Sequence, residues 1–263
     1  MAQKQKQHKQ QKLTIIEFVG APASGKTTLC SALHSHMLKN EHRAKNMWRV
    51  GQKLHFLRLR YKFLFADKEL KELLYDYIDT LSDKKYAQFY ADRILEFAYL
   101  VKLAKTKRIG KHHVHYALFN EGCVQFLAEM SAGEPLDNGS AELVQKIKDT
   151  VYKDCVTVLV QTETDEQTNL DRLINESRHA AEYAGMSEED IIAILRNTKA
   201  NIETAVAQFG FRKHIRIAVK DNLAEELHTL LHNLRHGEDA PKRQSTGTEE
   251  KMWSLHDWKS EDK

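Results

Sequence analysis

The feature that most constrains the fold is the segment Gly20–Thr27, which reads GAPASGKT. It matches the pattern G-x-x-x-x-G-K-[S/T], in which a glycine-rich loop joins a strand to a helix and wraps around phosphates. Both flanks agree with that reading. Residues 13–19 are mostly apolar and rich in β-branched side chains, as in a buried strand, and residues 28–39 place their apolar residues on one helical face. The segment therefore predicts a phosphate-binding loop rather than an ordinary glycine turn before a helix.

The residue types in this loop have a chemical explanation. Gly20 and Gly25 are expected to adopt backbone angles that a Cβ would disfavour, so that the loop can curl around a phosphate chain. Lys26 supplies a charge for the β- and γ-phosphates, and the Thr27 hydroxyl is placed to ligate Mg²⁺. We expect a nucleoside triphosphate to bind here with Mg²⁺. The residues expected to contact it are Gly20, Ala23, Ser24, Gly25, Lys26, Thr27 and Thr28.

Composition is that of a globular chain with no strong charge bias. The 263 residues are 41% hydrophobic and 29% charged, with a formal net charge of +3. That charge is uneven, because the first twelve residues carry four lysines and no acid, whereas residues 237–263 carry seven acids and five bases. The remaining charge is too small to indicate a nucleic-acid partner.

Cysteine usage and hydropathy bear on the compartment. The three cysteines, Cys30, Cys123 and Cys155, are far apart and odd in number, which argues against a disulfide framework or a zinc site. No apolar run approaches the roughly 18 residues that span a bilayer, and no apolar signal core follows the N-terminal lysines. We expect a cytoplasmic protein without a membrane partner.

The ends of the chain read as tails around one domain. Residues 1–12 are Gln- and Lys-rich and are expected to be disordered, whereas residues 13–236 carry the apolar periodicity of a folded domain. Residues 237–263 are expected to form a flexible tail, in which Trp253 and Trp258 leave open whether the tail docks. A homodimer is compatible with the sequence.

Further strands and helices alternate along the domain. We expect strands at about 45–50, 113–119, 154–160 and 215–219, and helices at about 166–175, 187–208 and 223–234. This alternation predicts an α/β fold, with a five-stranded parallel sheet and helices on both faces. Residues 53–107 contain neither Gly nor Pro and show helical periodicity, with a break near 82–85. We interpret them as an inserted helical subdomain.

A second candidate site residue is Glu121, which follows the predicted strand at 113–119. An acidic residue at the end of a neighbouring core strand can hold the Mg²⁺ shell or accept a proton. Asn120 stands where an Asp is common, and Gly122 would allow a tight turn. The alternative is that Glu121 caps the following helix, although its position after an apolar strand favours the functional role.

The third group of candidates is basic. Arg172 and Arg178 follow the strand at 154–160 and are candidates to neutralise charge on the transferred phosphoryl group, provided that the helix ends between them. A solvated helix face is the alternative for either one. For Asp92-Arg93 a surface ion pair is an equal alternative to a functional role. Further basic residues that could face substrate phosphates, or simply solvent, are Lys53, Arg58, Arg60, Lys62, Arg196 and Lys199.

Taken together, the motifs resemble the P-loop kinases, in particular the nucleoside and nucleotide kinase branch that includes thymidylate-kinase-like proteins. The resemblance rests on GAPASGKTT, a helical insert, a strand ending in FNEG, and VTVLV followed by the segment LDRLINESR. It implies a helical region over the acceptor, a mobile lid at about 172–210, and Mg-ATP as donor. The sequence departs from the family in its Asn-Glu pair and in lacking a tight arginine pair.

Other classes that share this loop fit less well. A GTPase should carry N-K-x-D, but residues 197–200 read NTKA, and the L-S-G-G-Q signature of ABC-type ATPases is absent. No second helical domain with sensor residues, as in AAA-type motors, is apparent. We therefore expect a kinase that transfers the γ-phosphoryl group of Mg-ATP to a small acceptor: a nucleoside, a nucleotide or a similar metabolite. The alternative is a nucleotide-binding NTPase or switch protein without such an acceptor.

Overall fold

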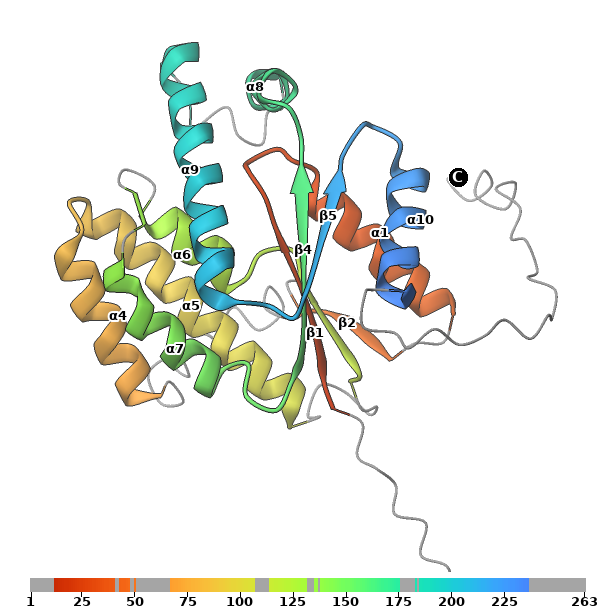
Figure 1. Cartoon of the computed structure of the whole chain (residues 1–263), viewed down its shortest axis with the longest axis horizontal. Coiled ribbons are helices and arrows are strands. Elements are labelled where there is room, and N and C mark those ends of the chain that lie inside the picture. Colours follow the sequence, from red (N-terminus) through yellow and green to blue (C-terminus); the bar gives the residue numbers. More distant parts are fainter. Residues whose placement is uncertain are drawn as a thin grey trace, which may run out of the picture.

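A five-stranded parallel sheet forms the centre of the molecule (Figure 1). The structure is a computed structural model that describes residues 12–40, 43–47, 50, 67–106, 114–131, 135, 136, 138–175, 183 and 185–236. The strand order is β2-β3-β1-β4-β5. The strands are β1 (Thr14–Val19), β2 (Ala44–Asn46), β3 (Tyr116–Phe119), β4 (Val156–Glu163) and β5 (Lys213–Ala218). The predicted parallel sheet is confirmed.

Helices cover both faces of this sheet, as the alternating pattern predicted (Figure 1). One face carries α1 (Lys26–Lys39) and α10 (Leu223–His236). On the other face lies a layer composed of α4 (Lys68–Thr80), α5 (Lys84–Lys105), α6 (Cys123–Met130), α7 (Ala141–Thr150) and α9 (Glu188–Phe209). Helix α8 (Glu166–Asn175) follows β4, and a short 3₁₀ helix at Asn138–Ser140 precedes α7.

Successive residues of β1 point to the two faces in turn. Ile16 and Phe18 pack with α1 and α10, whereas Ile15 and Val19 pack with the five-helix layer. The same alternation turns Glu17 toward the five-helix layer, where its side chain is buried. An acidic side chain in the middle of a buried strand requires partners on that face, and they are described below.

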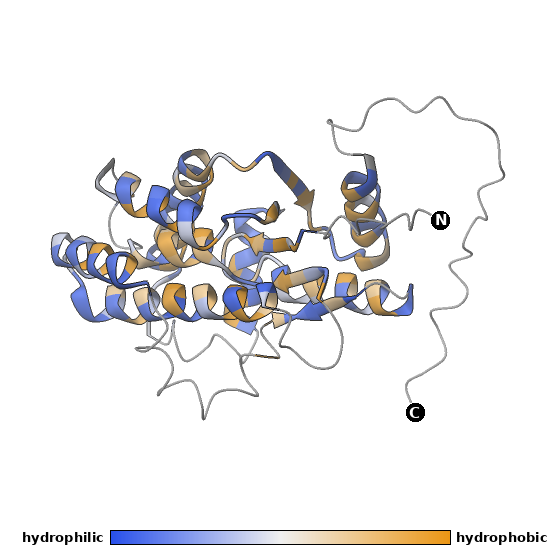
Figure 2. Ribbon diagram, turned by 90° about the horizontal axis from the view of Figure 1, so that it is seen from below, coloured by the Kyte–Doolittle hydropathy of each residue, from blue (hydrophilic) through white to orange (hydrophobic). Residues whose placement is uncertain are grey.

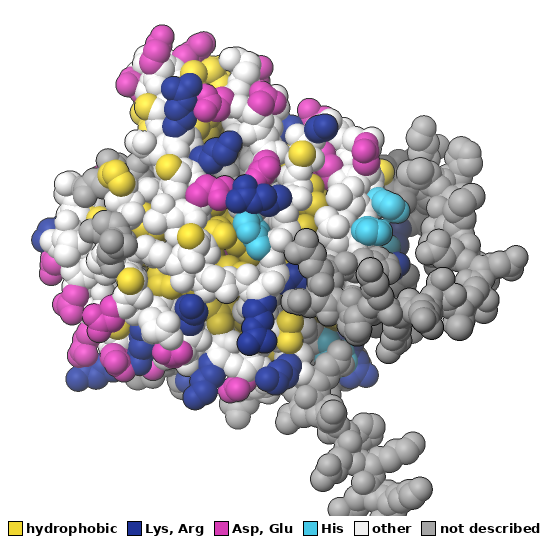
Figure 3. Space-filling view, in the orientation of Figure 1, with side chains coloured by type: hydrophobic (Ala, Val, Ile, Leu, Met, Phe, Trp, Pro, Cys, Tyr) yellow, Lys and Arg dark blue, Asp and Glu magenta, His cyan; other side chains and the backbone are white. Residues whose placement is uncertain are grey.

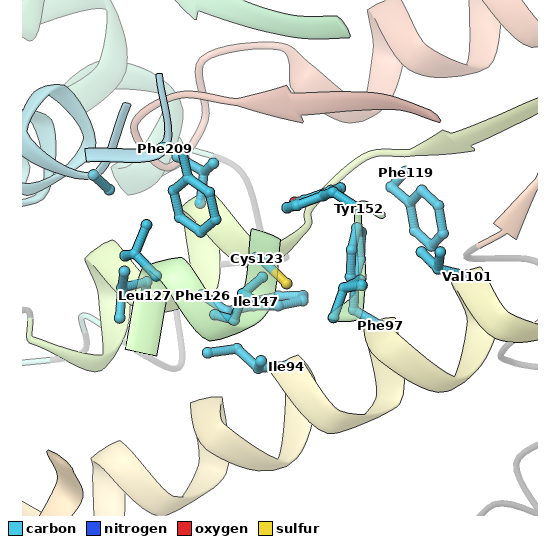
Figure 4. Close-up of a cluster of buried hydrophobic side chains, with 14 of the residues drawn as sticks. Ile94, Phe97, Val101, Phe119, Cys123, Phe126, Leu127, Ile147, Tyr152 and Phe209 are labelled. Carbon is cyan, nitrogen blue, oxygen red and sulfur yellow. The ribbon is translucent and has the colours of Figure 1, made fainter. Parts of the chain in front are cut away.

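The larger core lies between the sheet and the five-helix layer. Aromatic rings from distant segments meet there, and the rings of Phe97 and Phe119 are 4.3 Å apart while those of Phe97 and Tyr152 are 5.9 Å apart (Figure 4). Figure 2 shows the helices turning their hydrophobic sides inward and their hydrophilic sides outward. Because α4 and α5 belong to the same hydrophobic cluster as α6, the predicted insert packs directly on the main core.

Helix boundaries follow recognisable capping residues. The side chains of Asp67, Asp83 and Ser187 accept hydrogen bonds from amides at the first turns of α4, α5 and α9. Helix α1 is different, because its N-cap is Gly25 and no side chain caps it. The first amides of α1 are therefore left for another acceptor.

Strand β4 is longer at its C-terminal end than predicted. It continues to Glu163 rather than ending at residue 160, because its last polar residues form hydrogen bonds with neighbouring elements. Gln161 bonds to Glu203 at 2.6 Å and to His214 at 2.8 Å, and Arg216 joins Glu203 at 2.7 Å. Acidic, basic and histidine side chains adjoin one another on this face of the molecule (Figure 3). Strand β2 is shorter than predicted, and α7 was not predicted.

Several predictions concern residues outside the described ranges. They are the two tails with Trp253 and Trp258, the first part of the insert with Lys53, Arg58, Arg60 and Lys62, and Arg178. Of the helices that the structure does describe, none combines the length and apolar character needed to cross a membrane.

Candidate active site

The loop between β1 and α1 has the shape of a phosphate cradle. Gly25 has a φ of +85° and Ala23 a φ of +60°, so the loop curls immediately before α1 begins at Lys26. Gly20 does not have the positive φ that we expected. Its hydrogen is required for another reason, since a Cβ there would lie 2.4 Å from Thr162 Oγ1.

Lys26 lies over this loop. Its Nζ donates to the carbonyl of Gly20 at 2.8 Å and to that of Ala21 at 3.0 Å, and only 7% of the residue is exposed. Burial lowers the pKa of Lys26, while the carboxylates of Glu121 and Glu129 oppose that effect. The amine is therefore held by two loop carbonyls, while the two acidic side chains favour its charged form.

Asn120 rather than Glu121 is the residue that reaches the loop hydroxyl. Its Nδ2 lies 3.5 Å from Thr27 Oγ1, at the long limit for a hydrogen bond, and the residue is 6% exposed. Its Oδ1 is buried and has no hydrogen-bond partner among the residues that the structure describes. A buried amide oxygen without a partner, beside a hydroxyl, has the chemistry that Mg²⁺ or its bound water prefers. The residues at this position therefore fit the expected metal.

Two carboxylates line the far side of the cavity, on and before α6. Asn120 separates Glu121 from the end of β3, and Glu129 lies about two turns along α6. Glu129 accepts a hydrogen bond from Gln125 Nε2 at 2.7 Å, and the Tyr90 hydroxyl favours its ionised form. Burial, with Glu121 as the second cause, raises the pKa of Glu129 to about 7. Glu129 was not among our sequence candidates.

Arg93 is a second residue that sequence reasoning did not assign. It comes from α5 and forms an ion pair with Glu96 at 3.2 Å, and its guanidinium lies 5.5 Å from the centre of the Phe126 ring. Burial lowers the pKa of Arg93, whereas Glu121, Tyr90 and Glu129 favour its charged form. A charged pair three residues apart on an otherwise apolar helix face was the available signal.

Arg172 comes from α8 and contacts the loop. Its Nη1 donates to the carbonyl of Ala23 at 3.0 Å, and its Nη2 pairs with Asp221 at 2.5 Å. It thus fastens α8 to the phosphate loop and to the turn after β5. Arg196 instead pairs with Glu166 at 2.8 Å on the surface, as the solvated-face alternative proposed.

A single cavity of about 870 Å³ joins these groups. Its lining includes Val219, Asp221 and Leu223 after β5 and the aromatic side chains of α5. The charged or amide side chains that line it are Lys26, Arg93, Asn120, Glu121, Glu129, Arg172, Asp221 and Glu226. The volume is that of a site for a drug-sized or larger ligand.

Glu17 supports this site from below. Its Oε1 accepts the amide of Val124 at 2.8 Å, and its Oε2 accepts the hydroxyl of Tyr152. Gly122 packs against the carboxyl, with a φ of −147°, so it serves close approach rather than the tight turn that we expected. Burial raises the pKa of Glu17 to about 7. The carboxyl therefore fixes the start of α6, immediately after Glu121.

Comparisons with known proteins were made for sequence and structure. No family model matches the sequence, and no curated protein matches it. Among solved structures, the chain is similar to deoxyadenosine kinase from M. mycoides, at 12% identity and a TM-score of 0.49 over 85% of this chain and 99% of that one. It is also similar to shikimate kinase from Bacteroides thetaiotaomicron, at 13% identity and a TM-score of 0.46 over 85% and 98%. The five-stranded parallel sheet and the glycine loop that precedes α1 give the chain an α/β fold.

Proposed function

We propose that this protein is a phosphotransferase that moves the γ-phosphoryl group of Mg-ATP to a small acceptor. The observation that carries the proposal is one cavity with two chemically different halves. One half is the phosphate loop with Lys26, and the other is a wall of α5 and α6 that presents aromatic rings, Arg93 and two carboxylates. Hydrolysis needs only a water molecule beside the γ-phosphate, whereas this second half has room for another substrate.

In the donor half, each group has a role that follows from its position. The free amides at the start of α1 and the amine of Lys26 would hold the β- and γ-phosphates. Arg172 would keep the loop closed through the Ala23 carbonyl and add positive charge beside the triphosphate. Phosphoryl transfer depends mainly on such positioning and electrostatics, because the protein has little covalent chemistry to perform.

Thr27, Asn120 and Glu121 are the residues that would hold Mg²⁺. The Thr27 hydroxyl and the unpartnered Asn120 oxygen are neighbours, and the Glu121 carboxylate lines the same cavity. When bound, the ion would neutralise charge that accumulates on the β- and γ-phosphate oxygens.

The acceptor half indicates what kind of molecule would receive the phosphoryl group. Tyr86, Phe89, Tyr90 and Phe126 offer flat apolar surfaces, and the rings of Phe89 and Tyr90 meet edge to face at 5.1 Å. A planar acceptor with a hydroxyl group, such as a nucleoside, a nucleotide or a similar metabolite, suits this lining.

The proposal is tested by measuring ADP formation from Mg-ATP with a panel of acceptors. The panel contains the four deoxynucleosides, their 5′-monophosphates and shikimate. We expect at least one acceptor to stimulate ADP formation and to appear as a phosphorylated product by mass spectrometry. Tight nucleotide binding without stimulation by any acceptor would contradict the kinase and favour the switch protein.

A Lys26→Ala substitution tests the donor half directly. It should abolish turnover because the charge facing the γ-phosphate is lost, while the circular dichroism spectrum stays that of the wild type. Lys199→Ala, a change at an exposed lysine of α9, is the matched control. Wild-type activity in the Lys26 variant would refute the assignment of the loop.

A further inference from the structure

Gly20 is the point where the two halves of the cavity are tied together. Its carbonyl accepts from Lys26 Nζ at 2.8 Å, and its amide donates to Gln125 Oε1 at 3.0 Å. Gln125 is fully buried, and its amide nitrogen donates to Glu129 at 2.7 Å. The orientation of the Gln125 amide is therefore fixed from both ends, and Glu129 is held at a set position relative to the phosphate loop.

The surroundings of Glu129 place it at the reacting end of the acceptor half. It lines the cavity, and Lys26 is close enough to act on it electrostatically. Tyr90 of α5 favours the ionised form of Glu129, and Glu129 in turn favours the charged form of Arg93 on the same helix. Glu121 is the other carboxylate within electrostatic range. An acceptor hydroxyl that approaches a γ-phosphate held by Lys26 would meet this carboxylate.

We propose that Glu129 is the catalytic carboxylate that accepts the acceptor's hydroxyl proton, and that Gln125 is its positioning residue. This inference rests on the proposed function. The acceptor oxygen bonds to the γ-phosphorus as its O–H bond breaks, and the proton passes to Glu129 Oε. The bond between the γ-phosphorus and the β,γ-bridging oxygen breaks, and ADP leaves with that electron pair. Glu129 then releases the proton to solvent, so that ATP and R–OH give ADP, R–O–PO₃²⁻ and H⁺.

The environment of Glu129 suits that role. Burial and Glu121 hold its pKa near 7, where a carboxylate is a stronger base than at its usual value and is still ionised in part. The alternative is that Glu129 only anchors Gln125 and Tyr90. The two roles differ in what they predict for the pH dependence of kcat.

Three substitutions separate these roles in the full-length protein, using the most active acceptor of the panel. Glu129→Gln keeps the size of the side chain and one acceptor oxygen for Gln125 but removes the base, so kcat should fall about 100-fold or more while the KM for ATP changes little. The decrease in kcat at low pH, which is the acid limb of the plot of kcat against pH, should disappear.

Glu121→Gln should move that acid limb to lower pH, because Glu129 loses a negatively charged neighbour. Gln125→Met should move it to higher pH, because the bond that favours the ionised form is lost.

A readout without an acceptor separates failure of this inference from failure of the kinase proposal. Protein labelled with ¹³C at the glutamate carboxyls is titrated by NMR, with and without Mg·AMPPNP. The resonance missing in Glu129→Gln should titrate near pH 7, and the bound triphosphate should raise its pKa. The resonance missing in Glu17→Gln, also near 7 in the free protein, is the internal reference and should not move.

Each result has a defined meaning. A Glu129 resonance that ignores Mg·AMPPNP overturns the inference, even if a kinase activity has been found. So does a Glu129→Gln variant that keeps its acid limb or keeps kcat within about threefold of the wild type. A responding resonance in a protein that phosphorylates no acceptor overturns the proposed function, and the proton-transfer role with it.

Discussion

At the scale of single residues, the least expected feature is a carboxylic acid inside an apolar strand. Glu17 lies between Ile16 and Phe18 in β1, and it replaces the side-chain cap that α6 lacks. A cap normally comes from the residue just before a helix. Here the acceptor comes from a strand more than a hundred positions earlier, and the Tyr152 hydroxyl supplies its second hydrogen bond.

The stability of the protein should therefore depend on pH through Glu17. Its folded-state pKa, about 7, lies above its usual 4.5, so the folded state binds the proton more tightly than the unfolded state does. Glu17 makes its full contribution to the free energy of unfolding below about pH 4.5, and this contribution is lost as the pH rises through 7. The free energy of unfolding should fall by roughly 3 kcal/mol through this loss. The thermal unfolding temperature of the wild type should therefore decrease as the pH is raised from about 5 to about 8.

Glu17→Gln checks this prediction. The amide oxygen can still accept from Val124, and no charge develops, so the variant should be more stable than the wild type at about pH 8. As the pH is raised, the unfolding temperature of this variant should fall less than that of the wild type. Some decrease should remain, since the raised pKa of Glu129 also lowers the stability at higher pH. Glu142→Gln, on the exposed side of α7, is the control. An unchanged pH dependence in Glu17→Gln would mean that Glu17 is not the responsible group.

At the scale of elements, α6 is the helix that organises the site. Its first turn is held by Glu17, its middle by Gln125 on Gly20, and its last turn presents Glu129 to the cavity. On its other side, Asn201 of α9 donates to the carbonyls of Ala128 and Ser131. This half of α9 is therefore part of the core, and the lid expected at about 172–210 stays a prediction.

Gly122→Ala should disrupt this anchoring of α6. The new Cβ would lie 2.3 Å from Glu17 Cδ, and relieving the clash should cost about 1–3 kcal/mol of unfolding free energy in urea. In a Glu17→Ala background the same substitution should cost clearly less, because the clashing carboxyl is gone. Additive effects of the two changes would show that the strain lies elsewhere.

Elements differ in how far the sequence alone predicts them. The loop, α1 and α8 were predicted closely, since their signals are local: fixed glycines, a lysine and helical periodicity. The polar end of β4 was missed because Gln161 satisfies its amide only through residues on α9 and β5. Helix α7 carries a readable apolar face at Leu143, Val144 and Ile147, so its absence from our prediction was avoidable.

At the scale of the whole molecule, the site is assembled from segments that are remote in sequence. Arg172 on α8 joins Ala23 of the loop to Asp221 after β5, and Asp221 itself has a φ of +60°. No local sequence pattern indicates that these three residues contact one another. Arg172 could therefore be named as a candidate from the sequence, but its partners could not be predicted. For the same reason Glu129 escaped prediction and the role of Arg93 stayed open, because a cavity is a property of the packed chain.

Arg172→Ala should weaken nucleotide binding. Loss of two charge-assisted hydrogen bonds at a residue whose side chain is only 17% exposed should raise the Kd for Mg·AMPPNP by about tenfold or more, as measured by calorimetry. The matched control is Arg196→Ala, whose ion pair with Glu166 leaves the arginine side chain 65% exposed and should contribute little. Equal effects of the two substitutions would remove Arg172 from the donor half.

The two hydrogen bonds of the Gly20 backbone also limit the routes by which substrates can enter and products can leave the cavity. Its amide and its carbonyl connect, through Gln125 and Lys26, to the groups on opposite sides of the reaction. Moving α6 away from β1 would break buried hydrogen bonds at Gly20 and at Glu17 together. We therefore expect reactants to enter and products to leave the cavity past α8 and past the exposed aromatic side chains of α5, where Phe89 is 58% exposed.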